Sequence, residues 1–305
     1  MRDLAIRIEG LHKTYGTKSA VNGINLTVGK GEIFALLGPN GAGKTTTVEI
    51  LEGHRIRSSG EVSVLGFDPG LKESEFKQKI GIVLQSTGVE PYLTVKETLE
   101  LFAGYYRKRQ SPEDIMEITG LSNLSGSRVK RLSGGQQRRL DVAVGLVGDP
   151  DLFFLDEPTT GFDPSARRSA WQMISNLRSL GKTIFLTTHY MDEAQSLADR
   201  VAIMINGKIV KEGSPPELTG KESVTKIRFY IDTGSNDLPA DILAEVKSIG
   251  EMITIETSNP EKILFSLTDW SINNAVDLKG LTVSKPSLEE IYIDLVNGQD
   301  FEEIS

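Results

Sequence analysis

Residues able to bind a phosphate chain stand together near residue 40. The segment from Gly38 to Thr45 reads GPNGAGKT and fits the pattern GxxxxGK[ST]. Glycines let backbone N–H groups converge on phosphate oxygens, and the N-terminus of a following helix adds partial positive charge. In such a loop Lys44 reaches the β- and γ-phosphates, and the hydroxyl of Thr45 binds Mg²⁺. A glycine turn with a surface lysine is the alternative. The residues expected to contact a nucleotide here are Gly38, Pro39, Asn40, Gly41, Ala42, Gly43, Lys44, Thr45 and Thr46.

Two carboxylates follow an apolar run further along the chain. The segment 153–157 reads FFLDE and brings Asp156 and Glu157 to the end of a predicted strand. We expect Asp156 to hold Mg²⁺ through water and Glu157 to orient or deprotonate the attacking water. Alone, the pair could be an acidic strand end facing solvent. Its position after a phosphate loop favours the catalytic interpretation.

A third segment, LSGGQ at 132–136, predicts a second anion-binding helix terminus. Ser133 can cap the helix that follows, and two glycines leave backbone N–H groups open. The phosphate loop and this segment are two anion-binding sites. One nucleotide would need both of them only if the second is supplied by another subunit. A capped helix after a flexible loop is the alternative. Arg138 and Arg139 are expected to pair on the surface of that helix.

Hydrophobic patterning predicts the elements that position these residues. Short apolar runs bounded by turns predict buried strands, alternation predicts half-buried strands, and Asn206-Gly207 predicts a hairpin. Thr94 to Glu97 forms a capping box, and Ser111-Pro112 opens another helix. The predicted strands are 4–8, 24–28, 33–38, 151–156 and 183–188, and the predicted helices are 44–51, 94–109 and one beginning at Ser111.

Residues 221–305 have a different character. They carry 7 basic and 16 acidic residues, a net charge of −9, whereas residues 1–220 carry +1. Strand patterns at 224–231, 251–258 and 281–285 alternate with helix patterns at 239–249, 260–270 and 287–296. This order predicts a small α+β domain with a ferredoxin-like arrangement.

Composition excludes several classes of function. Neither region is the strongly basic domain expected of a nucleic-acid binder, so no nucleic-acid partner is expected. The chain has no cysteine, which rules out disulfides, thiol nucleophiles and Cys-ligated metal sites. No apolar run approaches 18 residues, and the first residues lack a signal-peptide core, so no membrane span is expected.

Together these motifs resemble those of the ATP-binding-cassette (ABC) ATPases, over roughly residues 4–220. In that family 38–45 is Walker A, 132–136 is the signature and 153–157 is Walker B. The resemblance implies an α/β P-loop NTPase cassette with a mixed sheet core and a helical subdomain at about 86–150. It places a nucleotide-binding domain at 1–220 and a small acidic α+β accessory domain at 221–305.

The resemblance also implies roles that spacing alone does not give. Tyr15 matches the aromatic that stacks on adenine, and Gln85 matches the glutamine that senses Mg²⁺ and the membrane subunit. Asp163 matches the D-loop, and His189 matches the switch histidine at the γ-phosphate. Leu84 stands where proline is common in the family. The signature residues expected to contact a partner's nucleotide are Ser133, Gly134, Gly135 and Gln136.

In this family two cassettes meet head to tail with ATP and Mg²⁺ between them. The chain has one copy of each motif, so the resemblance implies a homodimer, or a heterodimer with a similar cassette. A separate integral membrane permease subunit is also implied, with this chain peripheral on the cytoplasmic face of the cell membrane. The docking region would be Gln85 to Phe102, whose apolar residues Val89, Pro91, Tyr92 and Leu93 could equally pack the subdomain core.

The segment 286–296, PSLEEIYIDLV, resembles the C-terminal part of ABC-2 type exporters of the daunorubicin-resistance group. That branch implies efflux of a hydrophobic drug, antibiotic or lipid. An importer ATPase and a soluble non-transport cassette remain alternatives, and a non-enzymatic scaffold is disfavoured because the catalytic motifs are intact. The acidic domain could regulate the dimer or help hold it together. The sequence leaves the cargo open.

Overall fold

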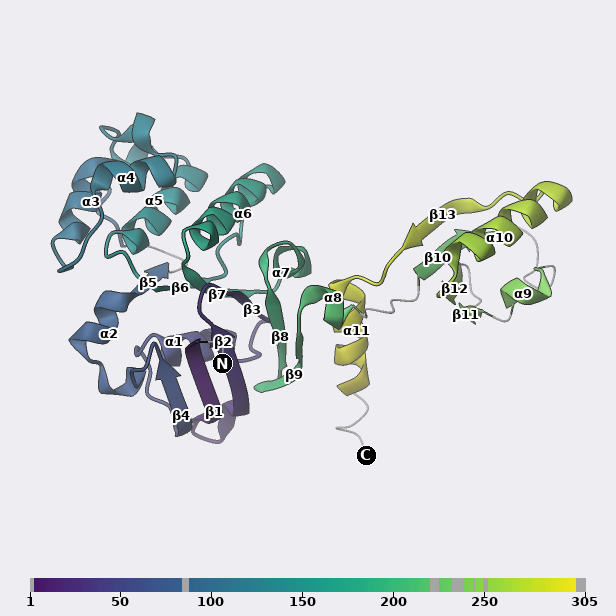
Figure 1. Cartoon of the computed structure of the whole chain (residues 1–305), viewed down its shortest axis with the longest axis horizontal. Coiled ribbons are helices and arrows are strands. Elements are labelled where there is room, and N and C mark those ends of the chain that lie inside the picture. Colours follow the sequence, from purple (N-terminus) through teal and green to yellow (C-terminus); the bar gives the residue numbers. More distant parts are fainter. Residues whose placement is uncertain are drawn as a thin grey trace. The chain divides into compact units, whose positions relative to one another are not determined.

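The computed structural model describes residues 3–83, 88–219, 225–231, 238–243, 245–248 and 252–299. The chain divides into two compact units, Met1–Pro215 and Pro216–Ser305 (Figure 1). The first unit contains every motif that the sequence predicts to bind a phosphate chain.

A six-stranded sheet forms the centre of the first unit. Its order is β5-β6-β7-β3-β8-β9, and all neighbours are parallel except the last pair. The predicted strands β3 and β7 are buried along their whole length, and β6 is buried up to its last residue. The carboxyl ends of these three parallel strands therefore meet at one edge of the sheet. The strand bounds are β3 Ile33–Leu37, β5 Ile80–Val83, β6 Leu152–Asp156, β7 Thr183–Thr188, β8 Arg200–Ile205 and β9 Lys208–Gly213.

The predicted hairpin joins β8 to β9. Asn206 and Gly207 have φ angles of 47° and 78°. Positive φ at both central residues is what a type I′ turn requires. The hairpin prediction is therefore confirmed.

A three-stranded antiparallel sheet packs against the central one. Its order is β2-β1-β4, and the strands are β1 Leu4–Tyr15, β2 Lys18–Gly29 and β4 Ser59–Val64. Buried Ile6 and Leu26 share one hydrophobic cluster with Phe34 and Phe185, whose rings stack at 5.5 Å. This core fixes the position of the loop that follows β3.

Three helices, α3, α4 and α5, contact one another and are grouped beyond the β5 end of the central sheet (Figure 1). Four others, α1, α2, α6 and α7, belong to the same unit, and α8 crosses the boundary at residue 215. The bounds are α1 Lys44–Leu51, α2 Ser74–Lys79, α3 Val95–Ala103, α4 Pro112–Ile118, α5 Gly134–Leu146, α6 Pro164–Ser179, α7 Met191–Leu197 and α8 Pro215–Leu218.

The helix predicted for 94–109 is shorter than expected. Its capping box forms, because the backbone N–H of Glu97 donates to the Thr94 hydroxyl and the Glu97 carboxylate accepts from Thr94. The helix ends at Ala103, before Gly104, a poor helix former. Beyond it, the backbone N–H of Arg107 donates to the side chain of Gln78 at 2.9 Å. Contacts outside the helix therefore determine its end.

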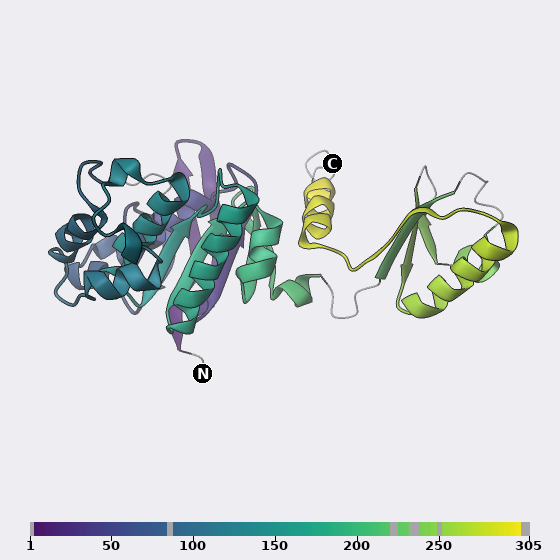
Figure 2. The same cartoon turned by 90° about the horizontal axis from the view of Figure 1, so that it is seen from above.

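The second unit is a four-stranded antiparallel sheet in the order β11-β12-β10-β13. Its strands are joined as βαββαβ, the ferredoxin-like connection that the sequence predicts. Figure 2 shows this sheet nearly edge-on with α10 to one side, where Ile263 and Leu267 are buried against Ile227 and Ile255. The bounds are β10 Thr225–Tyr230, α9 Ala240–Leu243, β11 Val246–Ser248, β12 Ile253–Thr257, α10 Pro260–Asn274, β13 Lys279–Ser284 and α11 Leu288–Gln299.

The helix predicted for 239–249 is wrong. Only one turn forms there, α9, and the chain then becomes strand β11. Val246 pairs with Ile255 of β12, and the backbone N–H of Glu256 donates to the carbonyl of Glu245 at 3.2 Å. Pairing along the sheet edge outweighs the local helical pattern.

Candidate functional site

The glycine loop lies between β3 and the start of α1. A Cβ on Gly38 would lie 2.3 Å from the Met204 carbonyl oxygen, and one on Gly43 would lie 2.2 Å from that of Ala20. Gly43 also has φ +106°. No side chain caps α1, and its first turn holds no acidic residue. The loop therefore needs glycine for space, and it leaves a helix N-terminus open to an anion.

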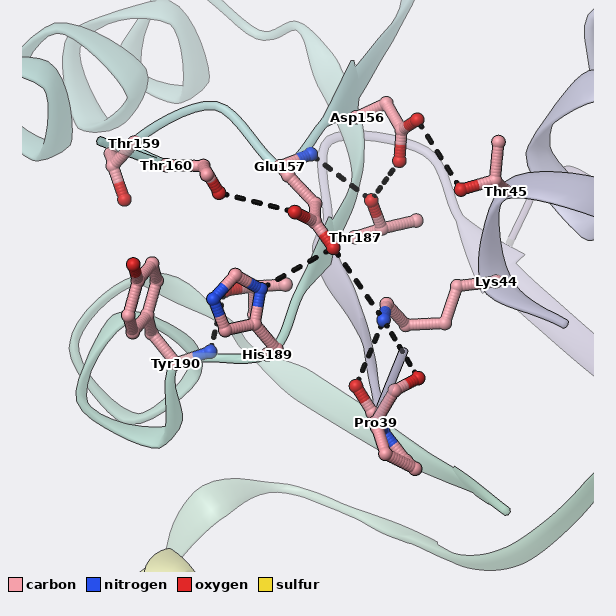
Figure 3. A network of polar contacts seen from close by, with 12 residues as sticks. Pro39, Lys44, Thr45, Asp156, Glu157, Thr159, Thr160, Thr187, His189 and Tyr190 are labelled. Atoms are coloured by element: carbon pink, nitrogen blue, oxygen red, sulfur yellow. Dashed lines mark hydrogen bonds and ion pairs between the residues drawn. The ribbon is translucent and has the colours of Figure 1, made fainter. Parts of the chain in front are cut away.

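Lys44 folds back over this loop. Its Nζ donates to the carbonyl oxygens of Gly38 at 2.8 Å and Pro39 at 3.2 Å, and it lies 3.6 Å from Glu157 Oε1 (Figure 3). Burial lowers the pKa of Lys44, and the nearby carboxylate of Glu157 opposes that shift. The ammonium is thus held at the mouth of the loop, where a phosphate chain would enter.

Asp156 and Glu157 lie at the carboxyl end of β6, next to the loop. The hydroxyl of Thr187 donates to Asp156 Oδ1, and the hydroxyl of Thr45 lies 3.5 Å from Asp156 Oδ2 (Figure 3). A hydroxyl and a carboxylate are hard oxygen donors of the kind that Mg²⁺ accepts together with water and nucleotide phosphates. The residues present therefore fit that ion.

Glu157 is the point where the polar contacts converge. Its Oε2 accepts from the Thr160 hydroxyl at 3.1 Å, and its Oε1 lies 3.3 Å from His189 Nδ1 (Figure 3). Its backbone adopts φ 47°, an uncommon value for a residue other than glycine, and its N–H donates to the Thr187 carbonyl at 3.1 Å. The structure thus brings Lys44, Glu157 and His189 together around one space.

Lys44 and Glu157, but not His189, line a pocket of about 480 Å³. It is bounded by the glycine loop, by Glu157 and by Tyr15. The Tyr15 ring is 40% exposed, with Lys13 Nζ 5.0 Å and Arg55 Cζ 5.3 Å from its centre. An exposed aromatic beside a phosphate-binding loop suits a purine base. The lining residues are Tyr15, Lys18, Ala20, Asn40, Gly41, Gly43, Lys44, Thr45, Thr46 and Glu157.

The signature segment lies on a different hollow. Ser133 caps α5 and forms a capping box with Gln136, while Asp163 caps α6 by accepting from the N–H groups of Ser165 and Ala166. Ser133, Gly135, Gln136 and Asp163 line this second pocket, of about 330 Å³, and none of them lines the pocket of Lys44. Within one chain, the predicted nucleotide contacts form two separate groups. Gln85 lies outside the described residues.

Two buried residues near the site differ from the sequence-based expectation or were missed by it. Arg138, expected on the helix surface, is 8% exposed, and its Nε donates to the Pro158 carbonyl at 3.2 Å. Glu193 is fully buried, and its Oε1 accepts from the Thr159 hydroxyl at 2.8 Å. Burial raises the pKa of Glu193. The hydrogen bonds from Thr188, Thr159 and Trp171 act in the opposite direction and lower this pKa. No pattern in the sequence pointed to Glu193.

Comparison with known proteins gives a consistent result. The family model described as "ABC transporter" matches residues 21–160. The Nod factor export ATP-binding protein I of Rhizobium sp. (strain N33) is 36% identical over 99% of this chain and 100% of its own length. The linearmycin resistance ATP-binding protein of Bacillus subtilis (strain 168) is 31% identical over 95% of this chain and 97% of its own length.

Solved structures similar to this chain are also cassettes of ABC transporters. The ADP conformation of an ABC transporter cassette is 26% identical, with a TM-score of 0.63 over 70% of this chain and 92% of that one. A dimeric cassette in a post-hydrolysis state with ADP and phosphate is 26% identical, with a TM-score of 0.61 over 68% of this chain and 98% of that one. In the described parts of the chain, no helix is long and apolar enough to cross a membrane. The chain belongs to the ABC transporter family, as an ATP-binding subunit that hydrolyses ATP.

Proposed function

We propose that this chain drives export of a hydrophobic drug, antibiotic or lipid through a separate membrane subunit. The observation that carries the catalytic part is the convergence of Lys44 and His189 on Glu157, which lines the pocket of the glycine loop together with Lys44. Two relatives, one named as a Nod factor export protein and one as a linearmycin resistance protein, support the export direction. An importer ATPase is the second candidate, since the same cassette fold and motifs would serve it.

The arrangement assigns a step to each group. Lys44 and the open N-terminus of α1 hold the β- and γ-phosphates, with adenine against Tyr15. Glu157 orients the attacking water and accepts its proton, and His189 contacts the γ-phosphate. When bound, Mg²⁺ would neutralise phosphate charge, and Thr45, Asp156 and Gln85 are the residues proposed to hold it. Lys44 moves from the carbonyl oxygens of Gly38 and Pro39 to the incoming phosphate.

The second half of the site comes from a partner cassette. Ser133, Gly135 and Gln136 line a second pocket of the same chain, so they and the intervening Gly134 are proposed to contact the nucleotide of a homodimeric or heterodimeric partner. Asp163 belongs with this half, because it caps α6 beside the signature segment. ATP then bridges two chains, and its hydrolysis removes the bridging contacts and lets the dimer open.

We also propose the division of labour along the chain. Residues 1–220 form the nucleotide-binding domain, with a helical subdomain at about 86–150, and residues 221–305 form an acidic accessory domain. An integral membrane permease is proposed to dock between Gln85 and Phe102. Tyr92 in this stretch is 64% exposed, which supports docking over core packing there. The chain would then be peripheral on the cytoplasmic face of the cell membrane.

Two measurements test the proposal. Replacing Glu157 by Gln keeps the shape and removes the base, so ATP binding is expected to persist while turnover falls by about a hundredfold or more. Unchanged turnover would remove Glu157 from its role as the base.

Purification of the tagged chain from gently solubilised membranes is expected to recover an integral membrane protein in stoichiometric amount. Recovery from cytosol alone would contradict the transport role and leave the ATPase intact.

A further inference from the structure

A buried carboxylate connects the two chain segments that carry Glu157 and His189. Glu193 lies in the first turn of α7, four residues after His189, and is fully buried. Its Oε1 accepts from the hydroxyl of Thr159, which lies two residues after Glu157, at 2.8 Å. The same oxygen accepts from Trp171 Nε1 of α6 at 3.1 Å. The Glu193 side chain thus connects its own helix, α7, with the turn after β6 and with α6.

The turn that Thr159 belongs to determines where Glu157 points. The N–H of Thr160 donates to the Glu157 carbonyl at 3.3 Å, and that of Phe162 donates to the Thr159 carbonyl at 3.1 Å. Thr160 also donates its hydroxyl to the Glu157 carboxylate, as Figure 3 shows beside Thr159. Glu157 itself has φ 47°, a backbone conformation that persists only when its surroundings enforce it. A contact that fixes Thr159 therefore also constrains Glu157.

The segment bearing His189 is fixed by the same helix. Thr188 is fully buried, and its hydroxyl accepts from the N–H of Tyr190, the N-cap residue of α7. The Nδ1 of His189 lies 3.3 Å from Glu157 Oε1. That distance depends on two loops that follow different strands, β6 and β7. The hydrogen bond from Thr159 to Glu193 links the chain segments that carry these two loops.

We propose that Glu193 is a positioning residue for ATP hydrolysis, whose buried carboxylate keeps the Glu157 turn and the His189 loop in a fixed relation. It does not touch the nucleotide pocket, whose lining residues do not include it. The inference rests on the proposed roles of Glu157 and His189. It predicts that loosening this contact slows the chemical step without weakening nucleotide binding, because a displacement of about 1 Å can cost about a hundredfold in rate.

The sharpest variant is Thr159→Val, which removes the hydroxyl donor and conserves shape. Its matched control is Trp171→Phe, which removes the other donor to the same oxygen but alters no loop that carries Glu157 or His189. In the full chain, or its complex with the membrane subunit, kcat of Thr159→Val is expected to fall by about tenfold or more with an unchanged Kd for ATP. Trp171→Phe is expected to keep kcat within about twofold.

Glu193 itself provides a second comparison. Glu193→Gln keeps an acceptor oxygen for Thr159 and is expected to retain most of the wild-type kcat. Glu193→Leu removes the acceptor and is expected to reproduce the loss seen in Thr159→Val. Rescue by the conservative variant would separate positioning from packing, because both replacements fill a similar volume.

Three results would overturn the proposal. They are wild-type kcat in Thr159→Val, an equal loss in Trp171→Phe, or a loss of ATP affinity parallel to the loss of kcat. Glu157→Gln is measured alongside as a reference. If it turns over normally, the proposed catalytic role fails; if it is inactive while Thr159→Val is fully active, only the role of Glu193 fails.

Discussion

Glu52 is a buried acid whose titration should be measurable as a change in stability. It follows α1 and is 4% exposed, and its Oε2 lies 3.1 Å from His54 Nδ1. Burial, with the nearby charges of Asp156 and Glu49, raises its pKa to about 8. The perturbation that tests this is Glu52→Gln, which cannot ionise and keeps a polar group beside His54.

The sign follows from proton linkage. Because the folded-state pKa of Glu52 is raised from 4.5 to about 8, the folded state holds a proton that the unfolded state releases above about pH 4.5. The protein therefore loses stability as pH rises from about 4.5 to 8. At pH 7 the loss is about 3 kcal/mol, since each pH unit in that window is worth about 1.4 kcal/mol. Glu52→Gln removes this loss.

Urea unfolding of nucleotide-free protein at pH 5, 6, 7 and 8 measures the effect, with m-values compared to check that the same transition is followed. The free energy of unfolding of Glu52→Gln relative to wild type is expected to increase steadily with pH. Glu61→Gln is the matched control, because it removes a carboxylate from an exposed position on β4. A difference between Glu52→Gln and wild type that does not change from pH 5 to 8 would refute the reasoning.

Other predictions concern the two halves of the site. Lys44→Ala is expected to weaken ATP binding by about tenfold or more in a fluorescent-nucleotide titration, and wild-type affinity would contradict the phosphate-loop role. Gly43→Ala should lower both affinity and melting temperature, because its Cβ would meet the Ala20 carbonyl and its φ is positive; Gly126→Ala, whose Cβ would meet nothing within 4 Å and whose φ is not positive, should change neither. Ser133→Arg should abolish turnover while a single chain still binds ATP, and wild-type ATPase activity there would rule out a signature contact across the dimer.

Local patterns predicted the parts of the fold that local interactions determine. The apolar runs at 33–38, 151–156 and 183–188 are strands β3, β6 and β7, because a strand buried on both faces needs continuous apolar sequence. The caps at Thr94 and Ser111 are also present. The fold class is shared with the solved cassettes.

The sequence-based predictions failed where contacts between residues distant in the chain determine the structure. Strand β11 forms because β12 offers an edge, although its sequence favours a helix. Arg138 is an ordinary charged residue in sequence, and only the packing of α5 against the turn after β6 makes it buried. The role of Glu193 depends on hydrogen bonds from Thr159 and Trp171, which lie 34 and 22 residues earlier in the chain. Sequence periodicity does not record such pairs.

The separation of the two pockets has a genetic consequence. A chain damaged at Lys44 keeps its Ser133 half, and a chain damaged at Ser133 keeps its Lys44 half, since none of the residues that the structure describes lines both pockets. In the proposed homodimer, two inactive alleles expressed together would therefore complement each other: in each mixed dimer one composite site would be intact and the other doubly damaged. With random pairing about half of the dimers are mixed, so about a quarter of the wild-type sites would return.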